Sequence, residues 1–175
     1  QGLLDVFTMM EKKGDLKGLT VAIVGDILHS RVARSNLFAL KKLGANVRFV
    51  GPPTLVPRSL EDYGAEVHHN LQSGIQDADV INILRIQLER QNKNLFPSIR
   101  EYKLLYGLTP ERIARACPEA LIMHPGPMNR GVEIDGTIAD DINRSVIQDQ
   151  VEMGVAVRMA AMDLLARNLR NKDAA

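Results

Sequence analysis

The sequence predicts an α/β protein built on a doubly wound sheet of about five parallel strands, with helices on both faces. Two observations lead to this prediction. Short apolar, β-branched segments alternate along the chain with segments of helical periodicity. The chain also has 175 residues, of which 45% are hydrophobic, which is enough for one domain with a sizeable core.

The predicted strands are short runs rich in apolar and β-branched residues. They cover residues 19–26, 46–53, 65–70, 79–87 and 121–123. Because strands and helices alternate, we expect a parallel sheet with right-handed connections, covered on both faces. The expected architecture is a Rossmann-like three-layer sandwich.

The segments around these strands carry helical signals. Leu3, Phe7 and Met10 repeat at helical spacing and share one helix face. Apolar residues from Val151 to Leu169 repeat in the same way and predict a long amphipathic helix. Shorter helices are expected at 33–43, 59–63, 71–78 and after Thr109-Pro110, with Thr109 as N-cap. Residues 88–106 are predicted to be a mobile loop followed by a short helix.

Composition and charge exclude several classes of protein. The net charge of +1 gives no electrostatic basis for binding nucleic acid or an anionic membrane. No apolar run is long enough to span a bilayer. The single cysteine, Cys117, excludes an internal disulfide and is consistent with a reducing compartment. The chain opens inside a helical pattern without a methionine, so we expect either a processed chain or part of a larger protein.

Ligands of doubly wound folds bind at the carboxyl ends of the strands, near the switch in strand order. This rule selects residues 25–34, 51–56, 85–90 and 124–134. A dinucleotide site is disfavoured, because the loop after the first strand has only Gly25 of the three glycines that such a site needs, and no Walker lysine occurs.

Arginines at two of these strand ends indicate an anion-binding site. Arg31 lies at a predicted helix N-terminus, where free N–H groups and the helix dipole favour anions, whereas we expect Arg34 to be solvated. Arg85 and Gln87 point the same way on an extended strand and suit a carboxylate. The alternative is a surface network of charges around Glu89, and spacing alone does not decide between the two.

The segment "HPGP" (124–127) ends the last predicted strand in a rigid loop. Its prolines fix φ, and Gly126 lets a ligand approach the backbone carbonyls, which would accept hydrogen bonds from an amine. A cis Gly126–Pro127 bond fits so tight a turn. His124 alone is expected to be structural. A site for two carboxylates and an amine would take an amino-dicarboxylic acid.

Four motifs carry a resemblance to a known family: "QGLLDVFT" at the start, "VGDILHSRVARS", "LRIQLER" and "MHPGPMNRGVEI". Their order and spacing are similar to those of the C-terminal, aspartate-binding half of aspartate carbamoyltransferase (aspartate transcarbamoylase), over nearly all of the chain. The resemblance implies transfer of a carbamoyl group from carbamoyl phosphate to L-aspartate, giving N-carbamoyl-L-aspartate and phosphate in pyrimidine synthesis.

The resemblance also implies residue roles, carried over position by position. Arg31, Arg85 and Gln87 match the residues that hold the aspartate carboxylates. Pro125 and Gly126 match the loop whose carbonyls face the reacting amine and carbamoyl groups.

Two further positions and two helices take roles from the same resemblance. Gln1 matches a glutamine that contacts the carbamoyl group, together with Pro125 and Gly126. Arg90 matches a residue that links the two domains when they close. Residues 1–175 would form the aspartate-binding domain, with interdomain helices at 1–13 and 151–170.

The implied partners include an N-terminal carbamoyl-phosphate domain, and full-length chains that form a homotrimer with active sites between subunits. This chain alone is therefore expected to be inactive. The family chemistry needs no metal or redox cofactor, and the expected location is the cytoplasm. The sequence leaves open whether a regulatory chain or a dihydroorotase associates with the enzyme.

Two alternatives remain. An ornithine carbamoyltransferase usually has His-Cys-Leu-Pro where this chain has His-Pro-Gly-Pro, and Arg31 and Arg85 would repel cationic ornithine. A non-catalytic amino-acid-binding or scaffold domain would not need Arg31, Arg85, Gln87 or Gly126.

Overall fold

The computed structural model describes residues 1–86 and 98–173 and confirms the predicted α/β fold. Its five strands are all parallel and lie in the order β3-β2-β1-β4-β5. Their bounds are Thr20–Val24 (β1), Asn46–Val50 (β2), Glu66–His68 (β3), Val80–Ile83 (β4) and Leu121–Met123 (β5). Each lies within a predicted strand, and four of the five are shorter than predicted.

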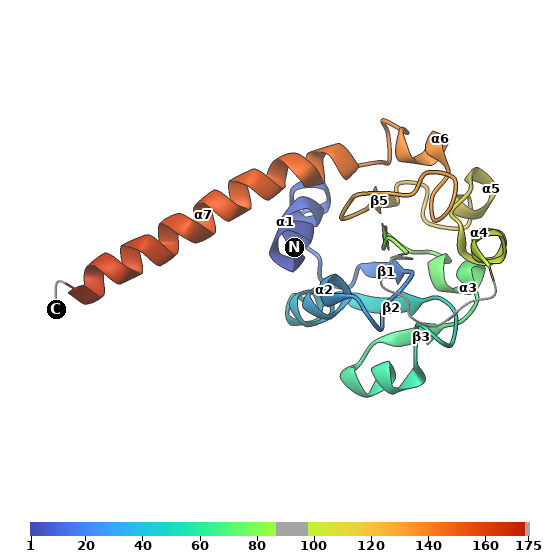
Figure 1. Cartoon of the computed structure of the whole chain (residues 1–175), viewed down its shortest axis with the longest axis horizontal. Coiled ribbons are helices and arrows are strands. Elements are labelled where there is room, and N and C mark those ends of the chain that lie inside the picture. Colours follow the sequence, from blue (N-terminus) through green and yellow to red (C-terminus); the bar gives the residue numbers. More distant parts are fainter. Residues whose placement is uncertain (87–97, 174–175) are drawn as a thin grey trace.

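Helices cover both faces of the sheet (Figure 1). They are α1 (Gly2–Lys13), α2 (Arg31–Lys42), η1 (Arg58–Tyr63), α3 (Leu71–Ile75), α4 (Ile99–Tyr106), α5 (Pro110–Ile113), α6 (Gly136–Ala139) and α7 (Ile147–Asp173). Figure 1 shows α1 and α2 on one side of the sheet and α3, α4 and α5 on the other. α7 packs against α1 and then extends well beyond the body of the molecule.

The core follows from the position of β1 and β4 at the centre of the sheet. Ala22 pairs with Arg48 of β2 on one side and with Ile81 of β4 on the other. Residues 21–23 and 80–82 are buried from water, because helices lie over both faces of these strands. Five of these six residues are apolar, which reflects two-sided burial, and the sixth is the buried polar residue Asn82.

Side-chain caps explain where several helices begin. The Ser30 hydroxyl accepts a hydrogen bond of 3.1 Å from the Ala33 N–H and starts α2 at Arg31. Asn70 caps α3 in the same way. Thr109 occupies the predicted N-cap of α5 and Pro110 its first turn, but the Thr109 side chain makes no capping hydrogen bond.

Among the helices, α6 and α7 differ most from the sequence prediction, and α3 ends at Ile75, three residues earlier than predicted. The four-residue helix α6 was not predicted, because a single turn carries no periodic signal. α7 begins at Ile147, four residues before the predicted pattern. In the described part of the chain, no helix is long and apolar enough to cross a membrane.

Candidate functional site

A cleft opens at the carboxyl end of the sheet, where the strand order changes direction between β1 and β4. It has a volume of about 220 Å³. Its walls come from the start of α1, the β1–α2 loop, the end of β4 and the loop after β5. The residues that line it include Gln1, Asp26, His29, Arg31, Arg85, Pro125 and Gly126. The structure thus brings together all of the predicted site residues that it describes.

Gly25 lies directly between the end of β1 and the cleft residue Asp26. Its φ is +130°, and an added Cβ would lie only 3.0 Å from the carbonyl oxygen of Leu84. The glycine therefore lets the β1–α2 loop turn close to the end of β4. As a result, groups that follow β1 and β4 share one cleft.

Two arginines give the cleft its positive charge. Arg31 is the first residue of α2, and its side chain is exposed. Arg85 follows β4 and is partly buried. Guanidinium groups bind carboxylates through paired N–H donors, so two of them in one cleft suit a dicarboxylate. Gln87 and Arg90, the other predicted residues of this segment, lie outside the described residues.

The loop after β5 forms another wall of the cleft. The Gly126–Pro127 peptide bond is cis, as the sequence suggested. Gly126 has φ +65°, and a Cβ at this position would meet no other atom within 4 Å. Pro125 and Gly126 line the cleft, so their backbone is open to a small ligand.

His124 has a structural role in this loop, because its side chain accepts a hydrogen bond from the loop backbone. Its side chain is fully buried. The Gly126 N–H donates to His124 Nδ1 over 2.9 Å, which leaves the ring proton on Nε2, 3.3 Å from Glu133 Oε1. Glu133 Oε1 also accepts a 2.6 Å hydrogen bond from the Asn129 N–H. The histidine therefore fixes the "HPGP" turn.

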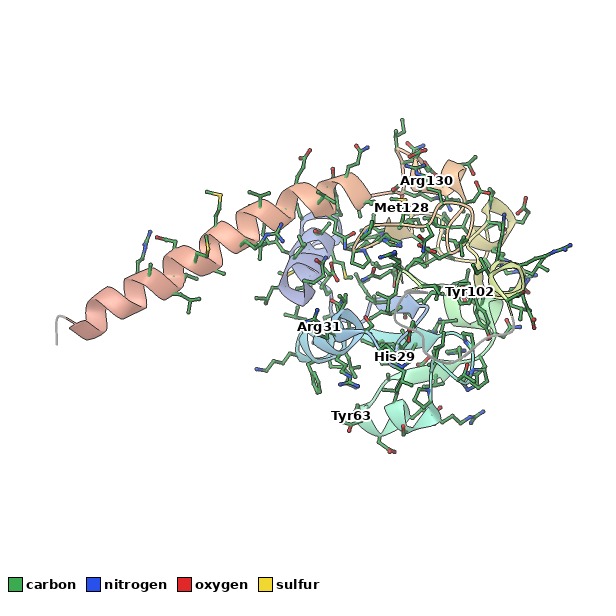
Figure 2. All side chains as sticks on the ribbon, viewed as in Figure 1. His29, Arg31, Tyr63, Tyr102, Met128 and Arg130 are labelled. Atoms are coloured by element: carbon green, nitrogen blue, oxygen red, sulfur yellow. The ribbon has the colours of Figure 1, made fainter. Side chains whose placement is uncertain are left out.

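Asp26 and His29 are cleft residues that sequence reasoning did not assign. The Asp26 carboxylate is nearly buried and lies 2.9 Å from His29 Nδ1. Because a carboxylate only accepts, Nδ1 carries a proton. Both residues lie between the end of β1 and the start of α2, and Figure 2 labels His29 beside Arg31, the first residue of that helix. The Asp-x-x-His spacing in a loop at a strand end could have identified these two residues as a candidate pair.

Gln1 closes the cleft at the beginning of α1. Its Nε2 donates a 2.8 Å hydrogen bond to Oδ1 of Asp5, one turn along the helix. Asp5 is fully buried and also receives hydrogen bonds from three other side-chain amides. Sequence reasoning did not find Asp5, because a single aspartate in an amphipathic helix ordinarily lies on the solvent side.

A larger depression lies near the amino end of β5, away from the strand ends expected to bind ligands. Its lysines are already engaged, because Lys13 donates to the carbonyl of Glu119 and Lys12 pairs with Asp149. The smaller cleft is therefore the better candidate site. Within the described residues, no cluster of His, Cys, Asp and Glu could hold a metal ion.

Tyr102 of α4 is almost fully buried and is not one of the residues that line the cleft. Burial, with smaller contributions from the charges of Glu133 and Asp26, raises the pKa of Tyr102 well above its ordinary value. Tyr102 therefore stays neutral at physiological pH and packs against Tyr106, with ring centroids 5.5 Å apart.

Comparison with known proteins gives consistent matches. Residues 17–165 match the family described as aspartate/ornithine carbamoyltransferase, Asp/Orn binding domain. The aspartate carbamoyltransferase catalytic subunit of Paracoccus denitrificans is 63% identical over 170 residues, covering 97% of this chain and 53% of that protein. The chain thus spans about half the length of the curated relatives it matches.

Solved structures agree with this result. The catalytic subunit of M. jannaschii aspartate transcarbamoylase superposes with a TM-score of 0.76 at 31% identity, covering 95% of this chain and 56% of that one. Aspartate transcarbamoylase from Trypanosoma cruzi, solved in complex with carbamoyl phosphate, gives a TM-score of 0.77 at 26% identity, covering 92% of this chain and 53% of that one.

Proposed function

Because the chain belongs to the aspartate/ornithine carbamoyltransferase family, through its Asp/Orn binding domain, we propose that it is the aspartate-binding half of an aspartate carbamoyltransferase. One observation carries the choice of substrate. Arg31 and Arg85 line the same small cleft as the open backbone of Pro125 and Gly126. Two cations facing a set of backbone acceptors match an amino acid with two carboxylates and one amine.

In this proposal, the cleft residues position the reactants. Arg31 and Arg85 bind the two carboxylates of L-aspartate. The carbonyl groups of Pro125 and Gly126 accept hydrogen bonds from the amine, and Gln1 contacts the carbamoyl group. Holding two reactants in line can contribute about 7–11 kcal/mol to lowering the barrier. Gln87 would add a further contact to aspartate, and Arg90 would link the domains on closure.

The chemical step needs no group beyond the two substrates. The amine nitrogen attacks the carbamoyl carbon and forms a C–N bond, through a tetrahedral intermediate. The bond between that carbon and the phosphate oxygen then breaks, and phosphate leaves with the electron pair and takes up the proton that the amine loses. Donors that face the developing negative charge lower the barrier further.

The second substrate, carbamoyl phosphate, would bind a separate N-terminal domain of a longer chain. The length of the relatives supports this, since the chain spans only 53% of the P. denitrificans protein. So do the exposed apolar side chains of α1 and α7, in particular Leu3, Phe7, Val155, Met159 and Met162. We propose that residues 1–13 and 151–170 form the contact between the domains. Full-length chains would assemble as cytoplasmic homotrimers.

The ornithine alternative shares the family and the fold but fits the cleft less well. Cationic ornithine would meet Arg31 and Arg85, and like charges in one cleft oppose binding. The high identity to aspartate carbamoyltransferase catalytic subunits also supports aspartate. A non-catalytic binding domain remains the outcome to expect if neither amino acid reacts.

Phosphate release by a full-length protein that contains this chain tests the proposal. L-aspartate and L-ornithine are compared at equal concentration with carbamoyl phosphate, for the wild type and for Arg85→Ala. Aspartate-dependent release that Arg85→Ala lowers by at least about tenfold, mainly through KM, supports the proposal, since a lost charge-assisted pair is worth more than 1.4 kcal/mol. Ornithine-dependent release, or none with either amino acid, rejects it.

A further inference from the structure

The buried carboxylate of Asp5, beside the cleft, accepts hydrogen bonds from four side-chain amides that lie in different parts of the chain. Asp5 is fully buried in α1. Its Oδ1 accepts hydrogen bonds from Gln1 Nε2 at 2.8 Å and Gln150 Nε2 at 2.7 Å. Its Oδ2 accepts from Asn36 Nδ2 at 2.6 Å and Asn82 Nδ2 at 3.4 Å. A carboxylate surrounded only by donors fixes which end of each amide faces it.

The neighbouring amides show how strongly Asp5 sets their orientation. The carbonyl oxygens of Asn36 and Asn82 are buried, and among the described residues they have no hydrogen-bond partner. Leaving a buried acceptor unpaired costs about 1–3 kcal/mol. Turning either amide around would instead bring its oxygen against the carboxylate. The donors therefore face Asp5 although the oxygens remain unpaired.

The same carboxylate is connected to both walls of the cleft. Gln1 stands at one wall, at the start of α1. Gln150 of α7 donates to Asp5 through Nε2, and its Oε1 accepts a 3.0 Å hydrogen bond from the backbone N–H of His124. His124 in turn holds the N–H of Gly126 on the other wall. One chain of hydrogen bonds, buried at its centre, thus links Gln1 to Gly126.

We propose that Asp5 is a positioning residue that orients the Gln1 amide and thereby selects the acyl phosphate. This inference rests on the proposed function, because it concerns the group that Gln1 meets in that cleft. Asp5 holds Gln1 Nε2 on the protein side, so Oε1 is the atom left for the ligand. An amide oxygen accepts a hydrogen bond from the NH₂ group of carbamoyl phosphate. The methyl group of acetyl phosphate, which has a similar shape, offers no donor.

Asp5→Asn changes the charge and the acceptors at this point with little change in volume. An asparagine presents one oxygen and one NH₂ group, so it cannot accept from all four amides. The Gln1 amide then loses its fixed orientation and can turn its NH₂ group toward the ligand. Binding of carbamoyl phosphate should weaken relative to acetyl phosphate. Hydrogen-bonding sites discriminate strongly against ligands that lack the matching group, so a loss of selectivity is the specific result.

The test uses the full-length enzyme and measures the dissociation constants of carbamoyl phosphate and acetyl phosphate. The variants are Asp5→Asn and the matched control Asp62→Asn, an exposed aspartate in η1. We divide the dissociation constant of acetyl phosphate by that of carbamoyl phosphate. This ratio should fall at least about fivefold toward unity in Asp5→Asn, which is equivalent to the loss of one net hydrogen bond. It should stay unchanged in Asp62→Asn. An unchanged ratio, or an equal weakening for both ligands, overturns the proposal.

Two further measurements separate the possible causes. Wild-type turnover of carbamoyl phosphate with aspartate tests the proposed function by itself, so an active wild type with an unchanged ratio in Asp5→Asn rejects only the role of Asp5. If Asp5→Asn does not fold, neutron diffraction from deuterated wild-type crystals decides. Deuterons between Gln1 Nε2 and Asp5 support the proposal, and Gln1 Oε1 facing Asp5 overturns it.

Discussion

The inner face of α1 buries two polar residues among its apolar ones, while the outer face leaves large apolar side chains exposed. On the inner face, Asp5 and Thr8 have no exposed surface. On the outer face, Leu3 and Phe7 are 71% and 46% exposed. Burying a polar group costs little free energy when the group is hydrogen-bonded. Contiguous exposed apolar side chains are typical of surfaces that bind another protein or domain. The inner face therefore forms part of the hydrogen-bonded interior, and the outer face is the surface that the proposed interdomain contact would cover.

α7 repeats this contrast. Gln150 near its beginning is almost fully buried and joins Asp5 to His124. Beyond it, Val155, Met159 and Met162 are more than half exposed. Figure 2 shows the side chains of this outer part projecting with no other element beside them. The comparison predicts that polar residues on the inner side matter for stability and apolar residues on the outer side do not.

The largest effect is expected from Asp5→Ala in the 175-residue chain. The change removes the acceptor of four side-chain amides, three of them buried, and breaking a buried charged network commonly costs about 3–5 kcal/mol. Urea unfolding followed by circular dichroism measures the loss, with Asp62→Ala as the exposed control. A loss of less than about 1 kcal/mol in the free energy of unfolding would show that the hydrogen bonds to Asp5 contribute little to stability.

Gln150→Leu should have an intermediate effect. It removes one donor to Asp5 and leaves the His124 N–H without its acceptor, so we expect a loss of about 1–3 kcal/mol. The substitution adds apolar volume at the same place, which offsets part of the cost. Urea unfolding again gives the value. Equal stability of Gln150→Leu and the wild type would mean that the link between α7 and the "HPGP" loop contributes nothing.

A smaller, pH-dependent effect is expected at the sheet edge. Burial alone would raise the pKa of Glu66, but hydrogen bonds from Arg48 and His68 outweigh it and lower the pKa from the ordinary 4.5. A lowered pKa in the folded state stabilises the fold above the unfolded value, and this contribution disappears as pH falls. Since the Glu66 carboxylate is more than half exposed, solvent screening limits the gain to about 0.2–1 kcal/mol.

Glu66→Gln checks this prediction. Unfolding at pH 7 should be easier for the variant, and the difference from wild type should shrink below pH 4.5 and vanish once the pH lies below the lowered pKa of folded Glu66. Glu61→Gln, at an exposed residue of η1, is the control. A difference that persists at low pH would attribute the effect to something other than the ion pair with Arg48.

Patterns along the sequence could predict the fold and the cationic part of the site. Runs such as 19–26 marked the strands, and the rule about carboxyl ends placed Arg31 and Arg85 in one cleft. Asp5 and Gln150 could not be found in this way. Their partners Asn36 and Asn82 lie on other elements, so nothing local distinguishes them from solvated polar residues.

The outer face of α7 shows a different limit. Periodicity located the apolar stripe through Val155 and Met159, but it carries no information about what lies against it. The family match and the length of the relatives supply the missing part as a proposal. Amphipathic patterning thus identifies the apolar face of a helix, but whether that face is buried depends on the domains or chains that pack against it.

The smallest effect on the 175-residue chain is expected from polar substitutions on this outer face. Phe7→Gln and Met159→Gln alter side chains that are 46% and 62% exposed, so each should change the free energy of unfolding by less than about 0.5 kcal/mol. In the full-length enzyme, the same changes should cost about 1–3 kcal/mol, because covered apolar side chains lose their burial. Urea unfolding of both forms, with exposed Tyr63→Gln in η1 as control, gives the difference. Equal, small effects in both forms would show that α1 and α7 do not form the interdomain contact.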